Sequence, residues 1–503
     1  MAPLHEAALD ADSFPRRLAA GAFPVNAALA VCGVLIGLFC VLAPLNVALM
    51  VLPGMALVAA VALKPEAGYY VSLAMLPFDL TQIYLYTSVH HYLFLIFPYM
   101  FPLTLTACVW GLYSLSGLRQ AAPRNAITAV MLMLITCEGL SLIWAPRTNL
   151  GILLLVSLSI NYLYFSLSQK VITSPKAVGY ALNALIIAAF ITSAGVFGAQ
   201  WYEYKAKYFL GDMGGIALHF GKHGTRLAGF GSENNSGGLC VTGVFMVIAR
   251  MYMNGKPRPS FRELGLIVLF VSGMILTASR GSLVGLVAGI SLLLLLNEDL
   301  RGRLFRLSAI FAAILGIIVL LTKPGMIDRM IVGIGLPSTT IFSEQKVSTG
   351  VSVADEGVSG LDQRKYWWGK ALARMTEQPF KLLSGLGIGG FILYSGTIYT
   401  HSLLLSFFFD IGLMGALILT AALAILLTSV ARTLRNKAIP RNIRLMVMAV
   451  VCGFFAEITV HGLIDYDFFS YTARLFWFRL GLLAAVINVA NQMAAVNGAK
   501  EAK

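Results

Sequence analysis

Two arginines of the sequence stand in short polar stretches beside long apolar runs. Arg226 lies in the glycine-rich stretch 224–237, and Arg280 lies in a Ser-Arg-Gly turn between two apolar runs. A guanidinium group is always charged and presents a planar fork of donors that suits phosphate oxygens, and glycine lets a bulky anion approach the backbone. Both stretches are therefore candidates for holding a phosphate. Alternatively, Arg226 meets lipid headgroups or Glu233, and Arg280 has a structural role beside a neighbouring acid.

A third stretch combines glycines with a histidine. Glycines recur from Gly385 to Gly390, and His401 follows at the start of the next apolar run. This pattern is not a dinucleotide-binding fingerprint, because it lacks the preceding strand and the following acidic residue that such a fingerprint needs. An imidazole can take a proton from a hydroxyl near neutral pH, so His401 is a candidate general base. The alternative is a structural histidine at a membrane boundary.

Further charged residues occur near the predicted ends of the last spans. Glu457 and His461 are four residues apart and would share one helix face, and Arg474 and Arg479 open the last span. They are candidates for orienting His401 or lining a cleft. Alternatively, they pair with each other and stabilise helix contacts.

Two aspartates are expected deeper in the apolar runs, and two more lie in a turn. Asp79 and Asp410 are either proton-relay groups of a transporter or buried hydrogen-bond partners. Asp465 and Asp467 form an Asp-x-Asp motif, which the predicted topology puts outside the cell as a solvated turn.

Composition shows which solvent surrounds these residues. The chain has 503 residues, is 58% hydrophobic and 12% charged, and has a mean hydropathy of +0.80. These values exclude an ordinary soluble domain. The net charge of +14 is spread in short basic blocks between apolar runs, so it reports membrane topology and does not indicate a nucleic-acid partner. The six cysteines show no metal-ligand spacing, and neither a disulfide framework nor a metal site is expected.

The apolar runs predict an all-α, polytopic integral membrane protein with about fourteen (twelve to fourteen) transmembrane helices. The expected spans are residues 25–45, 46–63, 68–88, 92–116, 126–145, 149–168, 177–198, 235–253, 262–278, 281–297, 305–322, 401–430, 443–462 and 472–493.

Basic residues in alternate loops predict the orientation, because Lys and Arg favour the cytoplasmic side. With both termini inside, the cytoplasmic loops hold Arg119 and Arg124; Lys170 and Lys176; Arg250, Lys256, Arg258 and Arg262; Arg301, Arg303 and Arg306; and Arg432, Arg435, Lys437, Arg441 and Arg444. The short outer loops hold Arg147, Arg280, Arg474 and Arg479.

This topology divides the chain into seven expected segments: a cytoplasmic tail (1–24), transmembrane helices (25–198), an outer loop (199–234), helices with the Ser-Arg-Gly turn (235–322), a large outer loop (323–400), C-terminal helices (401–493) and a cytoplasmic tail (494–503). In the large loop, the stretch from Asp362 to Phe380 has apolar residues at helix-like spacing: Trp367, Trp368, Ala371, Leu372 and Met375. This spacing predicts an interfacial helix on the outer membrane face, with its tryptophans at headgroup depth.

The order of these motifs resembles the O-antigen ligase and polymerase superfamily, the WaaL and Wzy-type membrane proteins. The resemblance covers roughly residues 224–415 and rests on Arg226-x-x-Gly229 with Asn234 downstream, Ser279-Arg280-Gly281, the Trp-bearing stretch Arg364–Ala371, Gly385-x-Gly387, and His401 before a glycine-containing helix. The chain departs from the family pattern at Ser402, where the family commonly has Asn, and at Glu233, where it has Pro.

The resemblance implies that Arg226 and Arg280 bind the diphosphate of an undecaprenyl-linked glycan donor and that His401 helps activate the acceptor hydroxyl. It further implies transfer without a metal or cofactor, with inversion at the anomeric carbon, at the periplasmic face of the bacterial inner membrane. Residues considered for supporting roles are Glu233, Asn234, Arg364, Glu457 and His461.

The expected function is polymerisation of lipid-linked repeat units into exopolysaccharide or O-antigen. A ligase would instead transfer the glycan to lipid A-core, and the length and span count favour a polymerase. The expected partners are the glycan donor, the acceptor, membrane lipids and, by family analogy, a chain-length regulator. A transporter or flippase would need ionisable groups along a transmembrane path. A structural partner of an assembly complex would need no single Arg or His.

Overall fold

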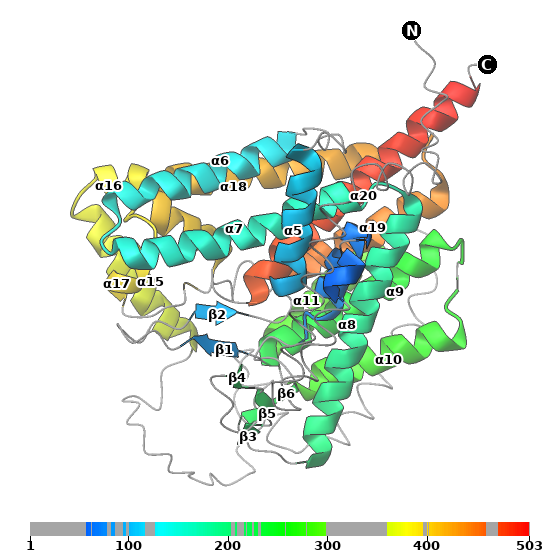
Figure 1. Cartoon of the computed structure of the whole chain (residues 1–503), viewed down its shortest axis with the longest axis horizontal. Coiled ribbons are helices and arrows are strands. Elements are labelled where there is room, and N and C mark those ends of the chain that lie inside the picture. Colours follow the sequence, from blue (N-terminus) through cyan, green and yellow to red (C-terminus); the bar gives the residue numbers. More distant parts are fainter. Residues whose placement is uncertain are drawn as a thin grey trace, which may run out of the picture. The chain divides into compact units, whose positions relative to one another are not determined.

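A computed structural model (Figure 1) describes the residues 57–61, 63–77, 82–85, 94–96, 100–115, 126–202, 207–208, 216–217, 219–223, 226–229, 233–256, 258–277, 279–297, 360–395, 400, 402–458 and 471–501. The chain divides into two compact units, Met1–Pro65 and Glu66–Lys503. The second unit holds every candidate site residue that the sequence predicts, and the following paragraphs concern that unit.

The described residues of this unit are mainly helical. The helices are α4 (Pro65–Ala74), α5 (Met100–Leu115), α6 (Ala126–Ser141), α7 (Thr148–Val171), α8 (Pro175–Tyr202), α9 (Glu233–Met253), α10 (Phe261–Leu276), α11 (Arg280–Leu296), α15 (Gly360–Thr376), α16 (Phe380–Ser384), α17 (Gly390–Ser395), α18 (Leu403–Arg435), α19 (Arg441–Glu457) and α20 (Tyr471–Glu501). A single turn of 3-10 helix, η1 (Leu142–Trp144), joins α6 to α7.

Short strands accompany the helices in segments that the sequence did not predict to be extended. The strands are β1 (Gln82–Leu85), β2 (Phe94–Ile96), β3 (Lys207–Tyr208), β4 (Ile216–Ala217), β5 (His219–His223) and β6 (Arg226–Gly229). They form two antiparallel sheets with the orders β2-β1-β4 and β3-β5-β6. The pairing of Ile83 with Ile216 ties the segment after α4 to the expected outer loop 199–234.

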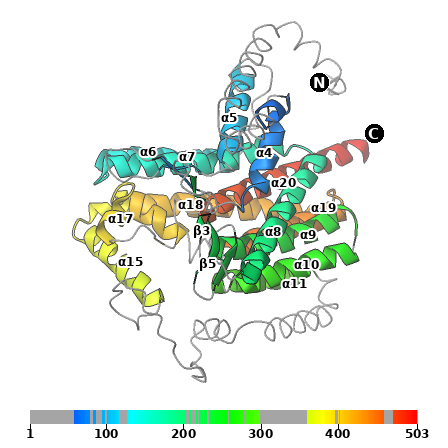
Figure 2. The same ribbon diagram turned by 60° about the horizontal axis from the view of Figure 1, so that its bottom comes forward.

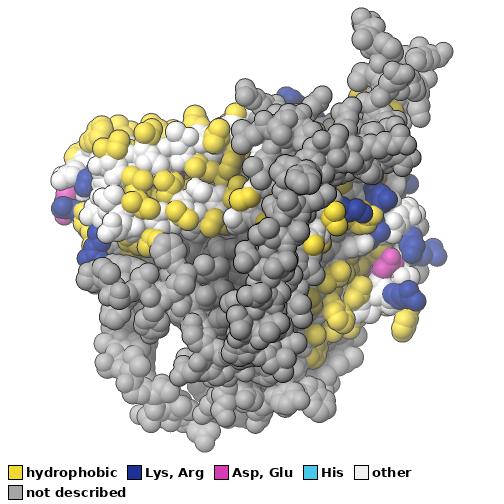
Figure 3. Space-filling view, in the orientation of Figure 1, with side chains coloured by type: hydrophobic (Ala, Val, Ile, Leu, Met, Phe, Trp, Pro, Cys, Tyr) yellow, Lys and Arg dark blue, Asp and Glu magenta, His cyan; other side chains and the backbone are white. Residues whose placement is uncertain are grey.

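Six described helices are long and apolar enough to cross a membrane: Ala126–Trp144, Thr148–Val171, Pro175–Ala199, Asn235–Met253, Leu403–Arg435 and Leu475–Asn497. Each matches an expected span within a few residues. Large apolar side chains on their surfaces are exposed, among them Leu132 and Leu417, and Figure 3 shows such side chains along the face of α6. An exposed apolar surface of this kind suits lipid contact. The helical membrane fold is therefore confirmed, and the count of about fourteen spans stays a prediction.

The bounds expected for the span 68–88 are wrong. Helix α4 ends at Ala74, and β1 begins at Gln82. Pro77 explains the end of the helix, because proline lacks the N–H that a helix requires and disfavours helical geometry in the preceding residue. Likewise, within the expected span 92–116, residues 94–96 form β2 and helix α5 begins at Met100. The last helix continues to Glu501, beyond the expected boundary at residue 493.

Helix α9 lies at the centre of the packing, with α8, α10, α11 and α19 around it, while α7 packs on α20 and α6 on α18 (Figure 2). Glycines allow the closest approaches. A Cβ added at Gly243 of α9 would lie 2.6 Å from the ring of Phe270 in α10, and one at Gly289 of α11 would lie 2.9 Å from Ala456 in α19. Small residues of this kind let membrane helices pack backbone to backbone.

The helix ends meet in the pattern that the predicted topology requires. At the ends expected to be cytoplasmic, Asn442 Nδ2 donates to the Met253 carbonyl at 3.3 Å, and Asn297 Nδ2 donates to the Tyr252 hydroxyl at 3.3 Å. At the ends expected to be outside, the Ile388 N–H donates to Ser141 Oγ at 2.9 Å. Which side of the membrane these ends face stays a prediction.

Candidate functional site

The first arginine block, the stretch 224–237 with Arg226, contains strand β6 of a hairpin and the start of helix α9. β5 and β6 pair with His223 opposite Arg226, and β6 lies beside α8 and α9. Glu233 and Asn234 are the first two residues of α9. The backbone of Arg226 therefore lies next to the helix that begins with the two polar residues considered for supporting roles.

The second arginine block, the Ser279-Arg280-Gly281 turn and the start of α11, packs directly against α9. Arg280 is the first residue of α11, and Ser279 caps this helix by accepting the Ser282 N–H at 3.4 Å. Both serines are buried, and a Cβ added at Gly237 of α9 would collide with Ser282 and lie 3.0 Å from Ser279. Glycine at position 237 therefore lets the start of α9 touch the start of α11, so the two arginine blocks are neighbours.

A third arginine reaches the same place from the last helix. Arg479 of α20 is 2% exposed, and its Nη2 donates to the carbonyl of Gly238 at 3.1 Å. Gly238 follows the glycine that touches α11. The sequence singled out Arg479 as a charge near the start of the last span, and the structure makes it a buried neighbour of the two motif blocks.

The glycine stretch is a loop docked on a break in α18. Ile411 and Gly412 interrupt the helical geometry of α18, and Gly412 has a φ of +70°. The N–H of Leu386 donates to the carbonyl of Phe409 at 2.7 Å, and that of Gly387 donates to the carbonyl of Asp410 at 2.9 Å. The loop thus binds backbone carbonyls next to the break.

The same loop binds the Asp410 side chain, which faces a second buried acid. The Gly389 N–H donates to the Asp410 carboxylate, and Asp410 is 3% exposed. Glu138 of α6 is fully buried, lies close enough for its charge to interact with Asp410, and has no hydrogen-bond partner for either carboxylate oxygen. One turn further along α18, Met414 Sδ lies 3.9 Å from Cys137 Sγ. Asp410 is therefore a buried hydrogen-bond partner, one of its two predicted roles.

The residues on either side of His401 are held firmly. Trp368 Nε1 of α15 donates to the Thr400 carbonyl at 2.8 Å. Ser402 caps α18 by accepting the Leu405 N–H at 3.4 Å, and Thr400 also bonds to Ser406. Thr400 and Ser402 are both buried. His401 lies outside the described residues, and its neighbours Thr400 and Ser402 are each held by hydrogen bonds.

The predicted helix of the large outer loop is confirmed as α15, which is followed by α16. Its tryptophans pack with Phe391 and Phe409 onto the glycine loop and α18, so they contact protein. Arg364 lies one turn before Trp368 on the same helix and is half-buried. The structure therefore places Arg364 on the helix that holds the residue before His401. The position of α15 at the membrane surface stays a prediction.

Glu457 ends α19, and His461 lies outside the described residues. The neighbouring Ala456 packs on Gly289, which is nine residues along α11 from Arg280, or about 13 Å. The backbone of Glu457 therefore lies deeper along the bundle than the start of α11.

No protein-family model matches the chain, and no curated protein sequence resembles it significantly.

The described residues thus form two groups of candidate elements. One group joins the stretches that contain Arg226 and Arg280 with Arg479, and the other joins the glycine loop, Asp410 and the two neighbours of His401, Thr400 and Ser402. Sequence reasoning missed Glu138, although a lone acid within an apolar run was a visible signal. Among the described residues, no three His, Cys, Asp or Glu side chains gather as metal ligands would.

Proposed function

We propose that the protein is a membrane glycosyltransferase that polymerises undecaprenyl-diphosphate-linked repeat units on the periplasmic side of the bacterial inner membrane. The contact of Gly237 and Gly238 with the start of α11 and with Arg479 carries this proposal. It joins two helix N-termini and three arginine-bearing elements. A diphosphate is the kind of anion that such a group favours, because helix N-termini and guanidinium groups both stabilise negative charge.

The chemistry follows from where charge develops. The acceptor hydroxyl oxygen attacks the anomeric carbon, the bond from that carbon to the diphosphate breaks with its electron pair leaving on the diphosphate, and His401 takes the hydroxyl proton. Arg226 and Arg280 stabilise the departing diphosphate, since fixed cations in a partly dry site stabilise developing charge without reorganisation. Arg479 fixes the backbone beside them. Glu233, Asn234, Arg364, Glu457 and His461 are proposed to support these groups.

The acceptor separates a polymerase from a ligase. A polymerase transfers the chain to another lipid-linked unit, and a ligase transfers it to lipid A-core. We propose the polymerase, with both termini in the cytoplasm and a chain-length regulator as an additional partner.

The test is glycan profiling of cells that carry Arg280→Ala or His401→Ala, with Arg262→Ala as the control. Arg262 is an exposed arginine near the start of α10, at the opposite end of the bundle from Arg280. We expect long glycan to fall by at least about tenfold, which corresponds to the loss of one charge-assisted contact, at unchanged membrane protein level. Accumulated lipid-linked units, with lipid A-core carrying a single unit, indicate polymerase loss. Bare core with preformed polymer indicates ligase loss.

The buried pair Glu138 and Asp410 favours a second candidate, a transporter or flippase of lipid-linked oligosaccharide. Ionisable groups within membrane helices often mark ion or substrate pathways. Glu138→Gln separates the two functions. A transporter that depends on this pair loses polymer in Glu138→Gln and keeps it in Arg280→Ala and His401→Ala. A transferase shows the reverse pattern.

A further inference from the structure

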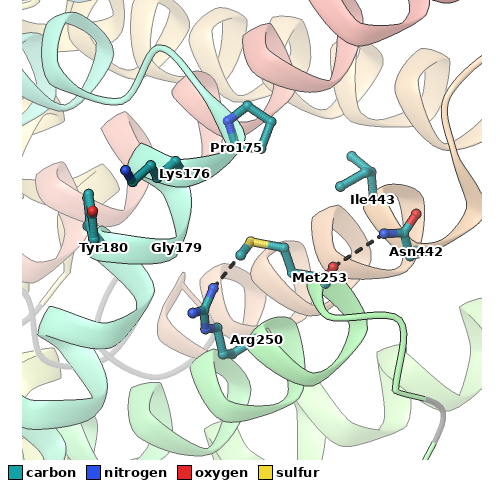
Figure 4. A pocket seen from close by; sticks show the side chains of 8 residues that line it. All are labelled: Pro175, Lys176, Gly179, Tyr180, Arg250, Met253, Asn442 and Ile443. Atoms are coloured by element: carbon teal, nitrogen blue, oxygen red, sulfur yellow. Dashed lines mark hydrogen bonds between the residues drawn. The ribbon is translucent and has the colours of Figure 1, made fainter.

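A cavity of about 540 Å³ opens at the end of the bundle that the basic loops predict to be cytoplasmic (Figure 4). It lies between the first turn of α8, the last turn of α9 and the first turn of α19. Lys176 and Arg250 supply its positive charge, and Tyr180, Met253 and Asn442 contribute further parts of the wall. The described residues that line it include two cations and no acid.

The guanidinium of Arg250 makes one weak hydrogen bond among the described residues. The contact that the structure gives to its Nη1 is the Met253 Sδ at 3.9 Å, and a thioether is a weak acceptor. The Asn442 amide donates to the Met253 carbonyl, and this bond holds the Asn442 side chain beside the cavity (Figure 4). Among the described residues, no acid gives this half-buried guanidinium an anionic partner.

Gly179 makes room for this guanidinium. A Cβ added at Gly179 would lie 2.7 Å from Arg250 Nη1 and 3.0 Å from the Met253 methyl carbon. The guanidinium therefore lies close to the backbone of α8, in space that the Cβ of any other residue would fill. Replacement of this glycine displaces the cation without changing the net charge.

The surrounding elements add positive potential and an apolar wall. α8 begins at Pro175 and α19 at Arg441, so the partially positive ends of two helix dipoles border the cavity. The Lys176 Nζ lies 5.9 Å from the ring of Tyr180, which is 50% exposed. The half-exposed ring and Met253 offer apolar surface next to the cations.

We propose that this cavity binds the phosphate group of an anionic phospholipid, with Arg250 and Lys176 contacting the phosphate and the apolar wall contacting the glycerol and acyl part. Basic pockets between transmembrane helices at the cytoplasmic side suit such headgroups. The proposal does not depend on the glycosyltransferase activity.

The test is native mass spectrometry of the purified full chain with added phosphatidylglycerol. Lys176→Gln with Arg250→Gln removes both cations, and Gly179→Ala displaces Arg250 at constant charge. The matched control is Arg432→Gln with Lys437→Gln, which removes two exposed cations near the α18–α19 connection. We expect lipid affinity to fall by at least about tenfold in both cavity variants, the loss expected for one charge-assisted contact, and to stay unchanged in the control.

Thermal unfolding with and without phosphatidylglycerol separates loss of binding from loss of folding, because a bound lipid raises Tm only where the site is intact. Retention of the lipid against an excess of inorganic phosphate supports the lipid as the ligand. Full displacement by inorganic phosphate assigns the site to a soluble phosphate and overturns the lipid. The site is overturned if the cavity variants bind phosphatidylglycerol as tightly as the control does. It is also overturned if the wild type binds phosphatidylethanolamine as tightly as phosphatidylglycerol.

Discussion

At the scale of single residues, the buried Arg479 has the largest structural consequence. A guanidinium removed from water is costly unless its donors are used, and this one bonds to the carbonyl of Gly238. That bond fixes α20 to the first turns of α9, beside the start of α11. The sequence predicted that Arg479 lies near the outer end of the last span, but it did not indicate that its partner would be a backbone carbonyl 241 positions away.

Arg479→Met is expected to destabilise the protein by about 1 to 3 kcal/mol, because it removes a hydrogen bond from a charged donor, while the Gly238 carbonyl keeps the Thr242 hydroxyl as a donor. Arg479→Lys keeps the charge but loses the planar fork, so it should recover part of the stability. Thermal unfolding of the purified protein measures both changes. Arg432→Met, at an exposed arginine of α18, is the control and should leave Tm unchanged. Equal Tm values for Arg479→Met and wild type would mean that this bond does not hold α20.

At the scale of elements, apolar periodicity predicted helix positions well and their interruptions poorly. α7 and α8 match their expected spans closely, because a long apolar run without proline has few other stable states in lipid. α4 stops early at Pro77, which a count of apolar residues does not register. A count of apolar residues could not predict the break in α18 either, because the break is stabilised by the glycine loop that docks on it.

Gly412 provides a test of this loop and helix contact. Its φ of +70° is unfavourable for other residues, and a Cβ there would collide with the carbonyl of Leu383. Gly412→Ala should therefore destabilise the protein by about 1 to 3 kcal/mol. Gly369 of α15 has open space around it, so Gly369→Ala should be neutral or stabilising by about 0.5 to 1 kcal/mol. Thermal unfolding of the two variants checks this difference, and a Gly412→Ala variant as stable as wild type contradicts the docking.

At the scale of the whole molecule, the sequence predicted which helix ends share a side, and the structure shows which of them touch. Alternating basic loops placed the C-terminal end of α9 and the N-terminal end of α19 together, and Asn442 bonds to Met253 there. Contacts that depend on exact side-chain placement, such as Gly237 on Ser279 and Ser282, needed the structure. Glycine and serine are common in membrane helices, so their pattern in the sequence does not predict which helix each of them contacts.

The predicted sidedness can be measured in a chain whose six native cysteines are replaced by Ala or Ser. Lys437→Cys lies in the exposed α18–α19 connection, expected to be cytoplasmic, and Lys370→Cys lies at an exposed position of α15, expected to be periplasmic. A membrane-impermeant maleimide should label Lys370→Cys in intact spheroplasts and Lys437→Cys only after permeabilisation. The two sites belong to opposite ends of the bundle, so labelling of Lys437→Cys alone would invert the topology. It would also place Arg280 and the glycine loop in the cytoplasm, away from periplasmic lipid-linked glycan, and the proposed reaction would then lack its substrate.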